Sequence, residues 1–325
     1  MTLPTTHQES AALRKTAWQA HQHEAAEKMT AMVLDAVTSP HTKRAYERAL
    51  TDFWDWRISQ APDHPLNKAL VNRYKAELEA SGMGAASINQ RLSAIRKMAR
   101  EAADNALLGD QIATGISRAS GIRQEGQRTG NWLTRREAQD LLNTPDTATL
   151  KGLRDRTILA VLIGCGLRRT EVARLRFEHI QQREGRWAIV DLIGKRNKAR
   201  TVPMPSWAKA AVDAWAVAAG LNLGTLAINE GRVFRSVNKG GSLSGDSITP
   251  QAIRNVVAAY GETLGHDIAP HDLRRTFAKL ARAGGADLEQ ISLSLGHESI
   301  EVTQRYLGTK QDFTDAPCDR LGISL

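Results

Sequence analysis

The sequence predicts a mainly α-helical protein of the α+β class, with one small antiparallel β-sheet and two domains. Apolar residues recur at helical spacing along most of the 325 residues. One stretch, residues 186–203, changes to a strand pattern around a charged turn. Residues 120–130 hold three Gly and two Arg with little to bury, which is typical of a linker. We therefore expect a mobile tail (1–23), a helical domain (24–119), a linker (120–130) and a second domain (131–325) whose C-terminal tail is 308–325.

Composition restricts the class of protein and the kind of partner. The 44 Lys and Arg against 35 Asp and Glu leave a net charge of +9, which favours a polyanion, either nucleic acid or an anionic membrane surface. No apolar run approaches the ~20 residues that span a bilayer, and the N-terminus lacks a signal-peptide pattern, so we expect a cytoplasmic protein without a membrane partner. Cys165 and Cys318 form neither a disulfide framework nor a metal-binding pair.

The helical domain is predicted from its caps and apolar spacing. Ser39-Pro40 starts the first firm helix, a second covers 67–80, and a third begins near Ser87. Arg and Lys recur on the outer face of this third helix, where they either contact a DNA backbone or form an ordinary solvated face. These basic residues are Arg91, Arg96, Lys97 and Arg100.

The second domain opens with a capping box from Thr134 to Glu137. An apolar helix over 153–163 is expected to break at residues 164–166, before another helix over 168–175. The strands of 186–203 enclose a charged turn at 195–199. Further helices are expected at 206–219, 249–264, 271–283, 287–295 and 299–307.

A phenol, two imidazoles and several guanidiniums recur near the end of the chain. Tyr can act as a nucleophile and Arg as a phosphate clamp, so the set suits phosphoryl transfer. Two His would also suit zinc, yet no third and fourth ligand stand at supporting spacing, so no metal site is predicted. The motifs are G-L-R-x-x-E (166–171), G-K-x-N-K (194–198), H-x-L-R-x-T-F-A (271–278), L-G-H-x-S-I-x-x-T (295–303) and Tyr306.

In this order, the motifs resemble the tyrosine recombinase (phage integrase) family, in its simple type without an arm-binding domain. The resemblance extends over residues 39–308 and implies a C-shaped clamp whose two domains close around double-stranded DNA. It implies site-specific recombination by transesterification through a 3′-phosphotyrosyl intermediate. The expected assembly is a homodimer on each site and a homotetramer in the synapse, and no cofactor is implied.

The resemblance assigns a role to each motif residue. Tyr306 would attack the scissile phosphate, while Arg168 and Arg274 grip its nonbridging oxygens. His271 would exchange a proton with the tyrosine hydroxyl, and His297 would hydrogen-bond the phosphate in the transition state.

The remaining candidates support these residues. Lys195 is the expected general acid toward the 5′-oxygen, with Lys198 as its rival in the same loop. The resemblance implies that Glu171 orients the site through His271. Glu171 can also simply pair with Arg168 or Arg174, each three residues away on the same helix, and the two readings are compatible. Candidate DNA-binding residues are Arg91, Lys97, Arg123, Arg128 and Lys198.

Two other functions fit part of this pattern. One is a catalytically silent DNA-binding protein of the same fold, which would have no need of the tyrosine. The other is a type IB topoisomerase, which shares the chemistry but relaxes DNA as a monomer. The complete set of motif residues disfavours the first, and the small size and helical domain before the linker disfavour the second.

Overall fold

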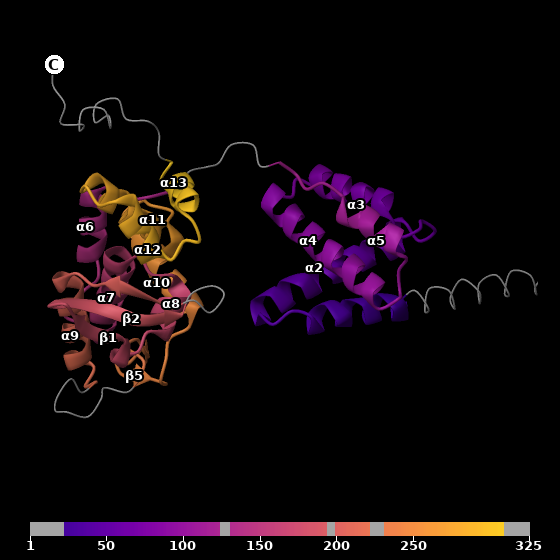
Figure 1. The fold of residues 1–325 in the computed structure, drawn as a ribbon. Coiled ribbons are helices and arrows are strands. Elements are labelled where there is room, and N and C mark those ends of the chain that lie inside the picture. Colours follow the sequence, from indigo (N-terminus) through magenta and orange to yellow (C-terminus); the bar gives the residue numbers. More distant parts are fainter. Residues whose placement is uncertain (1–22, 124–130, 194–198, 222–230, 309–325) are drawn as a thin grey trace, which may run out of the picture. The chain divides into compact units, whose positions relative to one another are not determined.

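The computed structural model of the protein describes residues 23–123, 131–193, 199–221 and 231–308. The chain divides into two compact units, Met1–Gln127 and Arg128–Leu325, with the division inside the predicted linker 120–130. Both the abundant helices and a small antiparallel sheet are present (Figure 1), which confirms the predicted fold class.

Every regular element in the described part of the first unit is a helix, and turns and short loops join these helices. Residues 23–35 are helical as well, and this helix was not predicted: its buried side chains Ala26, Met29 and Val33 do recur at helical spacing, but they are few and Ala26 is small. The other helices are α2 (Pro40–Gln60), α3 (Lys68–Ala80), α4 (Ala85–Asp104) and α5 (Asp110–Ser117).

Local capping explains where these helices begin. The Ser39 hydroxyl accepts a hydrogen bond from the Thr42 amide, and Pro40 occupies the first turn, as predicted. The core of the unit gathers around Phe53, whose ring packs edge-on against Tyr74 of α3 at a centroid distance of 5.2 Å.

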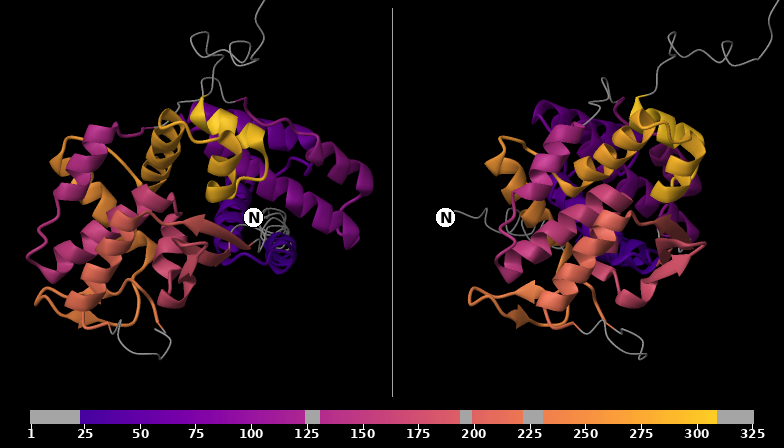
Figure 2. Two further views of the ribbon diagram at one scale, coloured as in Figure 1. Left: turned by 60° about the vertical axis from the view of Figure 1, so that its left-hand side comes forward. Right: turned by 90° about the vertical axis from the view of Figure 1, so that its left-hand side faces the viewer.

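The second unit carries the predicted strands and more helices than strands. Its helices are α6 (Arg135–Asn143), α7 (Leu150–Cys165), α8 (Arg169–Arg174), α9 (Ser206–Ala218), α10 (Pro250–Thr263), α11 (Pro270–Ala283), α12 (Leu288–Leu295) and α13 (Ile300–Leu307). Its strands are β1 (Ile180–Arg183), β2 (Arg186–Ile193), β3 (Ala199–Pro203), β4 (Ser236–Val237) and β5 (Leu243–Ser244). In both views of Figure 2, α13 lies at the end of this unit opposite the β4–β5 hairpin.

Helix α7 is buried along nearly its whole length and packs against α6, α9 and α11. The predicted break between two helices is present but lies two residues later than expected, because α7 continues through Gly164 to Cys165. It ends at Gly166, whose φ of 59° lies in the left-handed region. A Cβ here would stand 2.6 Å from the Phe277 ring, so glycine also allows α11 to approach.

Among the described residues, the larger sheet has the antiparallel order β1-β2-β3. Strand β1 was not predicted, because Ile180-Gln181-Gln182-Arg183 contains a single apolar residue. A tight turn with positive φ at Glu184 and Gly185 joins it to β2. The predicted charged turn, with Lys195 and Lys198, lies outside the described residues.

Within the described ranges, no helix combines the length and the apolar character that crossing a membrane requires.

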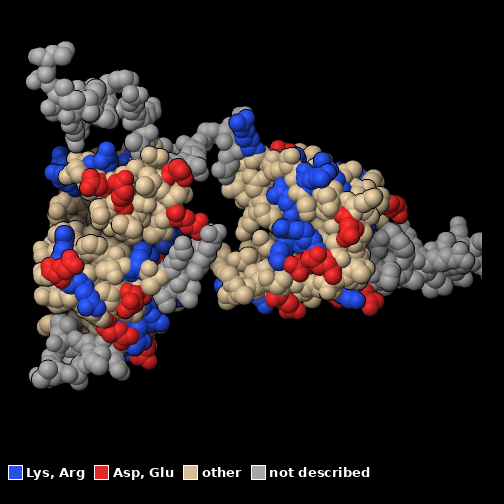
Figure 3. All heavy atoms as spheres, in the orientation of Figure 1, with Lys and Arg blue, Asp and Glu red and all other residues tan. Residues whose placement is uncertain are grey.

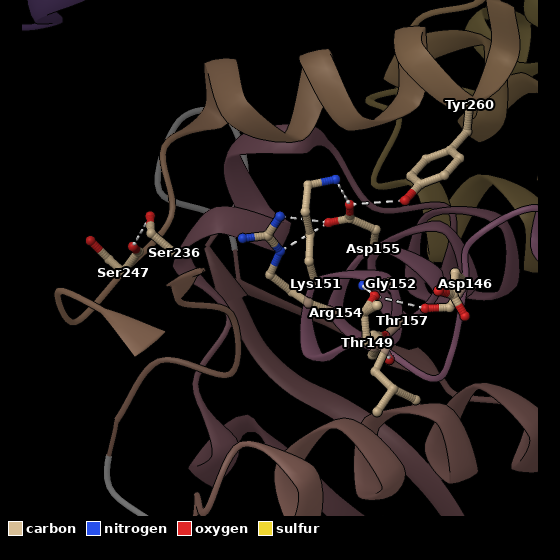
Figure 4. Close-up of polar contacts among 11 residues, drawn as sticks. Asp146, Thr149, Lys151, Gly152, Arg154, Asp155, Thr157, Ser236, Ser247 and Tyr260 are labelled. Carbon is tan, nitrogen blue, oxygen red and sulfur yellow. Dashed lines mark hydrogen bonds and ion pairs between the residues drawn. The ribbon is translucent and has the colours of Figure 1, made fainter. Parts of the chain in front are cut away.

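A buried carboxylate joins α7 to α10. Asp155 accepts hydrogen bonds from Lys151 Nζ at 2.9 Å, from Arg154 Nε at 2.9 Å and from the Tyr260 hydroxyl at 3.2 Å (Figure 4). Asp155 is fully buried and Arg154 nearly so, so each charge depends on the other for compensation. Burial, followed by the nearby Asp155 charge, raises the pKa of Tyr260 to about 12, which keeps this phenol a hydrogen-bond donor.

We expect Asp155→Ala to lower the free energy of unfolding by about 3–5 kcal/mol, because it leaves the buried Arg154 guanidinium without its carboxylate. Tyr260→Phe is the matched control, since it removes one hydrogen bond and should cost about 1 kcal/mol. Urea denaturation followed by circular dichroism measures both. Equal losses for the two variants would contradict the assignment.

Candidate functional site

Three of the predicted site residues line one cleft in the second unit. Arg168, at the start of α8, shares a cleft of about 340 Å³ with His271 and Arg274 of α11. The turn after α7 and the first turns of α11 therefore meet, although about a hundred residues separate them. The other residues that line the cleft are Arg169, Thr170, Arg254, Ala269 and Pro270.

Arg274 is held by the ends of two helices. Its guanidinium donates to the Gly166 carbonyl at 2.5 Å and to the Leu295 carbonyl, and its exposed fraction is 2%. Gly166 caps α7 and Leu295 ends α12, so both carbonyls carry the partial negative charge of a helix C-terminus. Burial, followed by the charge of Arg168, lowers the pKa of Arg274 to about 9, still above neutral pH.

Glu171 is buried between two guanidiniums. Its Oε1 accepts from Arg168 NH1 at 2.9 Å and from Arg200 NH1 at 2.9 Å, and its Oε2 accepts from Arg200 NH2 at 2.8 Å. Burial alone would raise the pKa of Glu171, but hydrogen bonds from Arg200 and the Arg168 amide, with both charges, lower it to about 2. In the described part of the chain, Arg168 and Arg200 rather than His271 hold this carboxylate, which agrees with the expected pairing of Glu171 with Arg168.

His297 follows the left-handed residue Gly296, which ends α12 with a φ of 60°. Its Nδ1 lies 2.8 Å from the Thr303 hydroxyl of α13, which fixes the direction of the ring. Burial, followed by the charges of Arg274 and Arg168, lowers the pKa of His297 to about 4, so the imidazole is neutral at neutral pH.

Tyr306 lies on α13 between the two histidines. Its ring is edge-on to His271, with centroids 5.4 Å apart, and to His297, with centroids 5.2 Å apart. The Arg275 guanidinium lies 4.9 Å from the ring centroid. The phenol donates to the backbone carbonyl of His271 at 3.3 Å.

The protonation states of Tyr306 and His271 are complementary. Burial raises the pKa of the Tyr306 phenol, although Arg274 and Arg275 oppose the shift, so the hydroxyl keeps its proton at neutral pH. Burial, followed by Arg275 and Arg274, lowers the pKa of His271, so its imidazole is neutral and can accept a proton. A protonated phenol thus lies beside a neutral imidazole that can accept a proton.

The predicted DNA-binding residues differ in whether they pair with an acidic side chain and in whether the structure describes them. Arg91 pairs with Asp52 at 2.8 Å and Lys97 with Glu101 at 2.5 Å, so neither lies on a purely basic face. Figure 3 shows acidic side chains among the basic ones on the visible face of the first unit. Arg123 is exposed, whereas Arg128, Lys195 and Lys198 lie outside the described residues.

Arg254 and Arg200 also belong to the site, and both lie outside the predicted motifs. Arg254 of α10 lines the cleft, and nothing in its helical pattern separates it from an ordinary exposed arginine. Arg200 of β3 did carry a signal, because it stands two residues before the buried Val202. Alternation along a strand places both side chains on the inner face, and a charged residue there requires a buried partner.

In the parts of the chain that the structure describes, no group of three or more His, Cys, Asp or Glu is arranged to hold a metal ion.

Comparisons with sequence families agree with the division of the chain. Residues 131–312 match the Phage integrase family, and residues 30–105 match the Phage integrase, N-terminal SAM-like domain. Tyrosine recombinase XerC of Myxococcus xanthus is 31% identical over 273 residues, which cover 83% of this chain and 87% of that protein. The XerC of Pelobacter propionicus is 30% identical over 282 residues, covering 84% of this chain and 86% of that protein.

Solved structures of the same fold include complexes with DNA. A λ integrase (75–356) dimer bound to a COC′ core site has a TM-score of 0.67 at 14% identity, covering 89% of this chain and 97% of that chain. XerH site-specific recombinase bound to a palindromic difH substrate has a TM-score of 0.63 at 17% identity, covering 84% and 77%. At identities this low, the structural similarity establishes the shared fold alone.

The pKa of His297 gives a direct test of the geometry of the site. In the free protein we expect the imidazole to titrate near pH 4, because burial and two arginines disfavour its cationic form. Binding of a phosphate should raise this pKa, since the anion favours the cation. An NMR titration measures both values, with the resonance assigned by its loss in His297→Gln. A pKa near 6.5 in the free protein would disprove the described environment.

Proposed function

The chain belongs to the phage integrase family, and from that premise we propose how its residues carry out recombination. It is a tyrosine-type recombinase, an enzyme that breaks and rejoins DNA strands at specific sites. The proposed substrate is a double-stranded target site, and the proposed compartment is the bacterial cytoplasm, where such DNA lies.

The observation that carries the proposal is the position of Tyr306. Its ring lies against both His271 and His297, and His271 lines the cleft with Arg168 and Arg274. A phosphodiester in this cleft would meet cations for its nonbridging oxygens and a phenol for attack on phosphorus. A binding protein without activity has no need of this combination.

In the proposed first step, the Tyr306 hydroxyl leaves the His271 carbonyl and its oxygen attacks the phosphorus. The neutral His271 imidazole takes the phenolic proton, which the raised pKa of Tyr306 makes necessary. Arg168 and Arg274 stabilise the charge that grows on the nonbridging oxygens, and His297 donates a hydrogen bond to one of them. The bond between phosphorus and the 5′-oxygen breaks as the bond between the Tyr306 oxygen and phosphorus forms.

We assign protonation of the leaving 5′-oxygen to Lys195 rather than to Lys198, the other lysine of the same motif. The products are a 3′-phosphotyrosyl ester and a free 5′-hydroxyl. Attack by the 5′-hydroxyl of a second strand then releases the tyrosine and joins the strands. The ester conserves the energy of the broken bond, so no cofactor is proposed.

Exchange between two duplexes requires more than one protomer. We propose a homodimer on each target site and a homotetramer in the synapse, and sedimentation of the protein with two site-bearing duplexes measures that stoichiometry. The two units would close around each duplex, with Arg91, Lys97, Arg123, Arg128 and Lys198 meeting phosphates.

The decisive assay traps the covalent intermediate. Nicked DNA from the sequence that flanks the gene should give a denaturant-resistant adduct with the wild-type protein and none with Tyr306→Phe, because only the phenol can form the ester. Tyr260→Phe is the control for loss of a tyrosine hydroxyl elsewhere in the same unit. An adduct that survives Tyr306→Phe would exclude Tyr306 as the nucleophile, and tight binding without an adduct would exclude catalysis.

A 5′-bridging sulfur substrate tests the general acid. A thiolate leaves without protonation, since thiols are far more acidic than alcohols. Lys195→Ala should therefore cut ordinary DNA at least about 100-fold more slowly than wild type, and should cut the sulfur substrate at close to the wild-type rate. Lys198→Ala is the matched variant in the same sequence motif and should slow the cleavage of both substrates to the same extent. The opposite pattern would transfer the role to Lys198.

A further inference from the structure

Arg200 contacts two separate parts of the catalytic site from an inward position on β3. Its guanidinium is 10% exposed and approaches Glu171 through both terminal nitrogens, at 2.9 and 2.8 Å. Its Nε donates to the Ser294 carbonyl at 3.0 Å. These bonds direct the planar fork into the protein rather than toward the cleft.

The contact between Arg200 and the Ser294 carbonyl is one of three similar contacts at the end of α12. Successive carbonyls at the end of α12 each receive an arginine: Ser294 from Arg200, Leu295 from Arg274 and Gly296 from Arg168, the last at 3.5 Å. The final carbonyls of a helix lack intrahelical partners and carry partial negative charge. The next residue is His297, so the three guanidiniums hold the backbone that presents its imidazole.

Close packing supports the same conclusion. A Cβ added at Gly296 would stand 2.9 Å from Cδ of Arg200, so the turn before His297 lies directly on the Arg200 side chain. Across the sheet, Arg200 is in register with Leu192 of β2, which fixes where the long side chain starts. The position of Arg200 is therefore set by a strand and not by a loop.

The charges explain what the first contact does. Glu171 is buried and would hold Arg168 strongly if it had no other partner. Arg200 supplies the second positive charge in a bidentate geometry, which shares the carboxylate between two cations. Arg168 then keeps hydrogen-bonding capacity for a phosphate in the cleft.

We propose that Arg200 is a positioning residue for DNA strand cleavage, which leaves Arg168 free for the phosphate and holds the end of α12 so that His297 reaches it. The proposal rests on the proposed function, in which both residues contact the scissile phosphate. Arg200 itself touches no reacting atom and acts through Glu171 and the α12 carbonyls.

The test compares single-turnover adduct formation on nicked site DNA, at saturating protein, for wild type, Arg200→Met and Arg200→Lys. The methionine variant should react about 10- to 100-fold more slowly, the usual loss when a supporting partner of an active-site residue is removed. The lysine variant restores the charge without the fork, so it should recover part of the rate. Arg183→Met, an exposed arginine of the same sheet, should match wild type.

Two readouts separate positioning from structure and from DNA binding. The dissociation constant for the site should stay within about twofold of wild type, because binding energy comes mainly from phosphate contacts that Arg200 does not make. Glu171→Gln combined with Arg200→Met should lose less than the product of the two single losses, since both act through one ion pair.

Each outcome decides between the proposals. A wild-type protein without any adduct sinks the proposed function. With an active wild type, a methionine variant at the wild-type rate, a loss of rate matched by a loss of affinity, or multiplicative losses in the double variant would overturn the role of Arg200. If Arg200→Met fails to fold, Arg200→Lys decides, and a wild-type rate for it would equally overturn the role.

Discussion

The second unit depends on burying a positive charge where helices end. Arg274 has lost almost all contact with solvent, and carbonyls at the ends of α7 and α12 replace the water around it. These carbonyls have no partners within their own helices, and the Arg274 guanidinium donates a hydrogen bond to one of them at the end of each helix. Arg274 also lines the cleft, and because these carbonyls fix its guanidinium, it would be a preorganised ligand for the phosphate in the proposed function.

The same principle orders the rest of the site. Glu171 is a buried anion among arginines, and its negative charge offsets the repulsion between Arg168, Arg200 and Arg274. The proposed phosphate site needs these positive charges close together. Burial, together with the positive field of the arginines, lowers the pKa of both histidines and keeps them neutral at neutral pH. In the proposed mechanism, His271 is therefore available as a base and His297 as an uncharged donor, and one electrostatic arrangement serves both phosphate binding and proton transfer.

Much of this could be predicted from the sequence, because the motif residues are chemically distinctive and their caps are local. Ser39, Thr134 and the helix of Tyr306 follow from short patterns that the structure confirms. Residues 23–35 were missed although Ala26, Met29 and Val33 recur at helical spacing, and β1 was missed because it contains a single apolar residue. Arg200 carried a local signal, its alternation with the buried Val202, but its partner Ser294 lies 94 residues away and could not be identified from a local pattern.

The long sequence separations within the site bear on the order in which the protein folds. Arg274 bonds to Gly166 across 108 residues, and Arg200 to Ser294 across 94. Contacts between residues so far apart in the sequence are expected to form late, because closing the loop between them costs entropy, whereas α6 and α7, which are adjacent in the sequence, can pack earlier. The guanidiniums therefore converge only once nearly the whole second unit has been synthesised and folded. A nascent chain on the ribosome holds its cutting chemistry in separate pieces, and the ability to break DNA arises together with the completed domain.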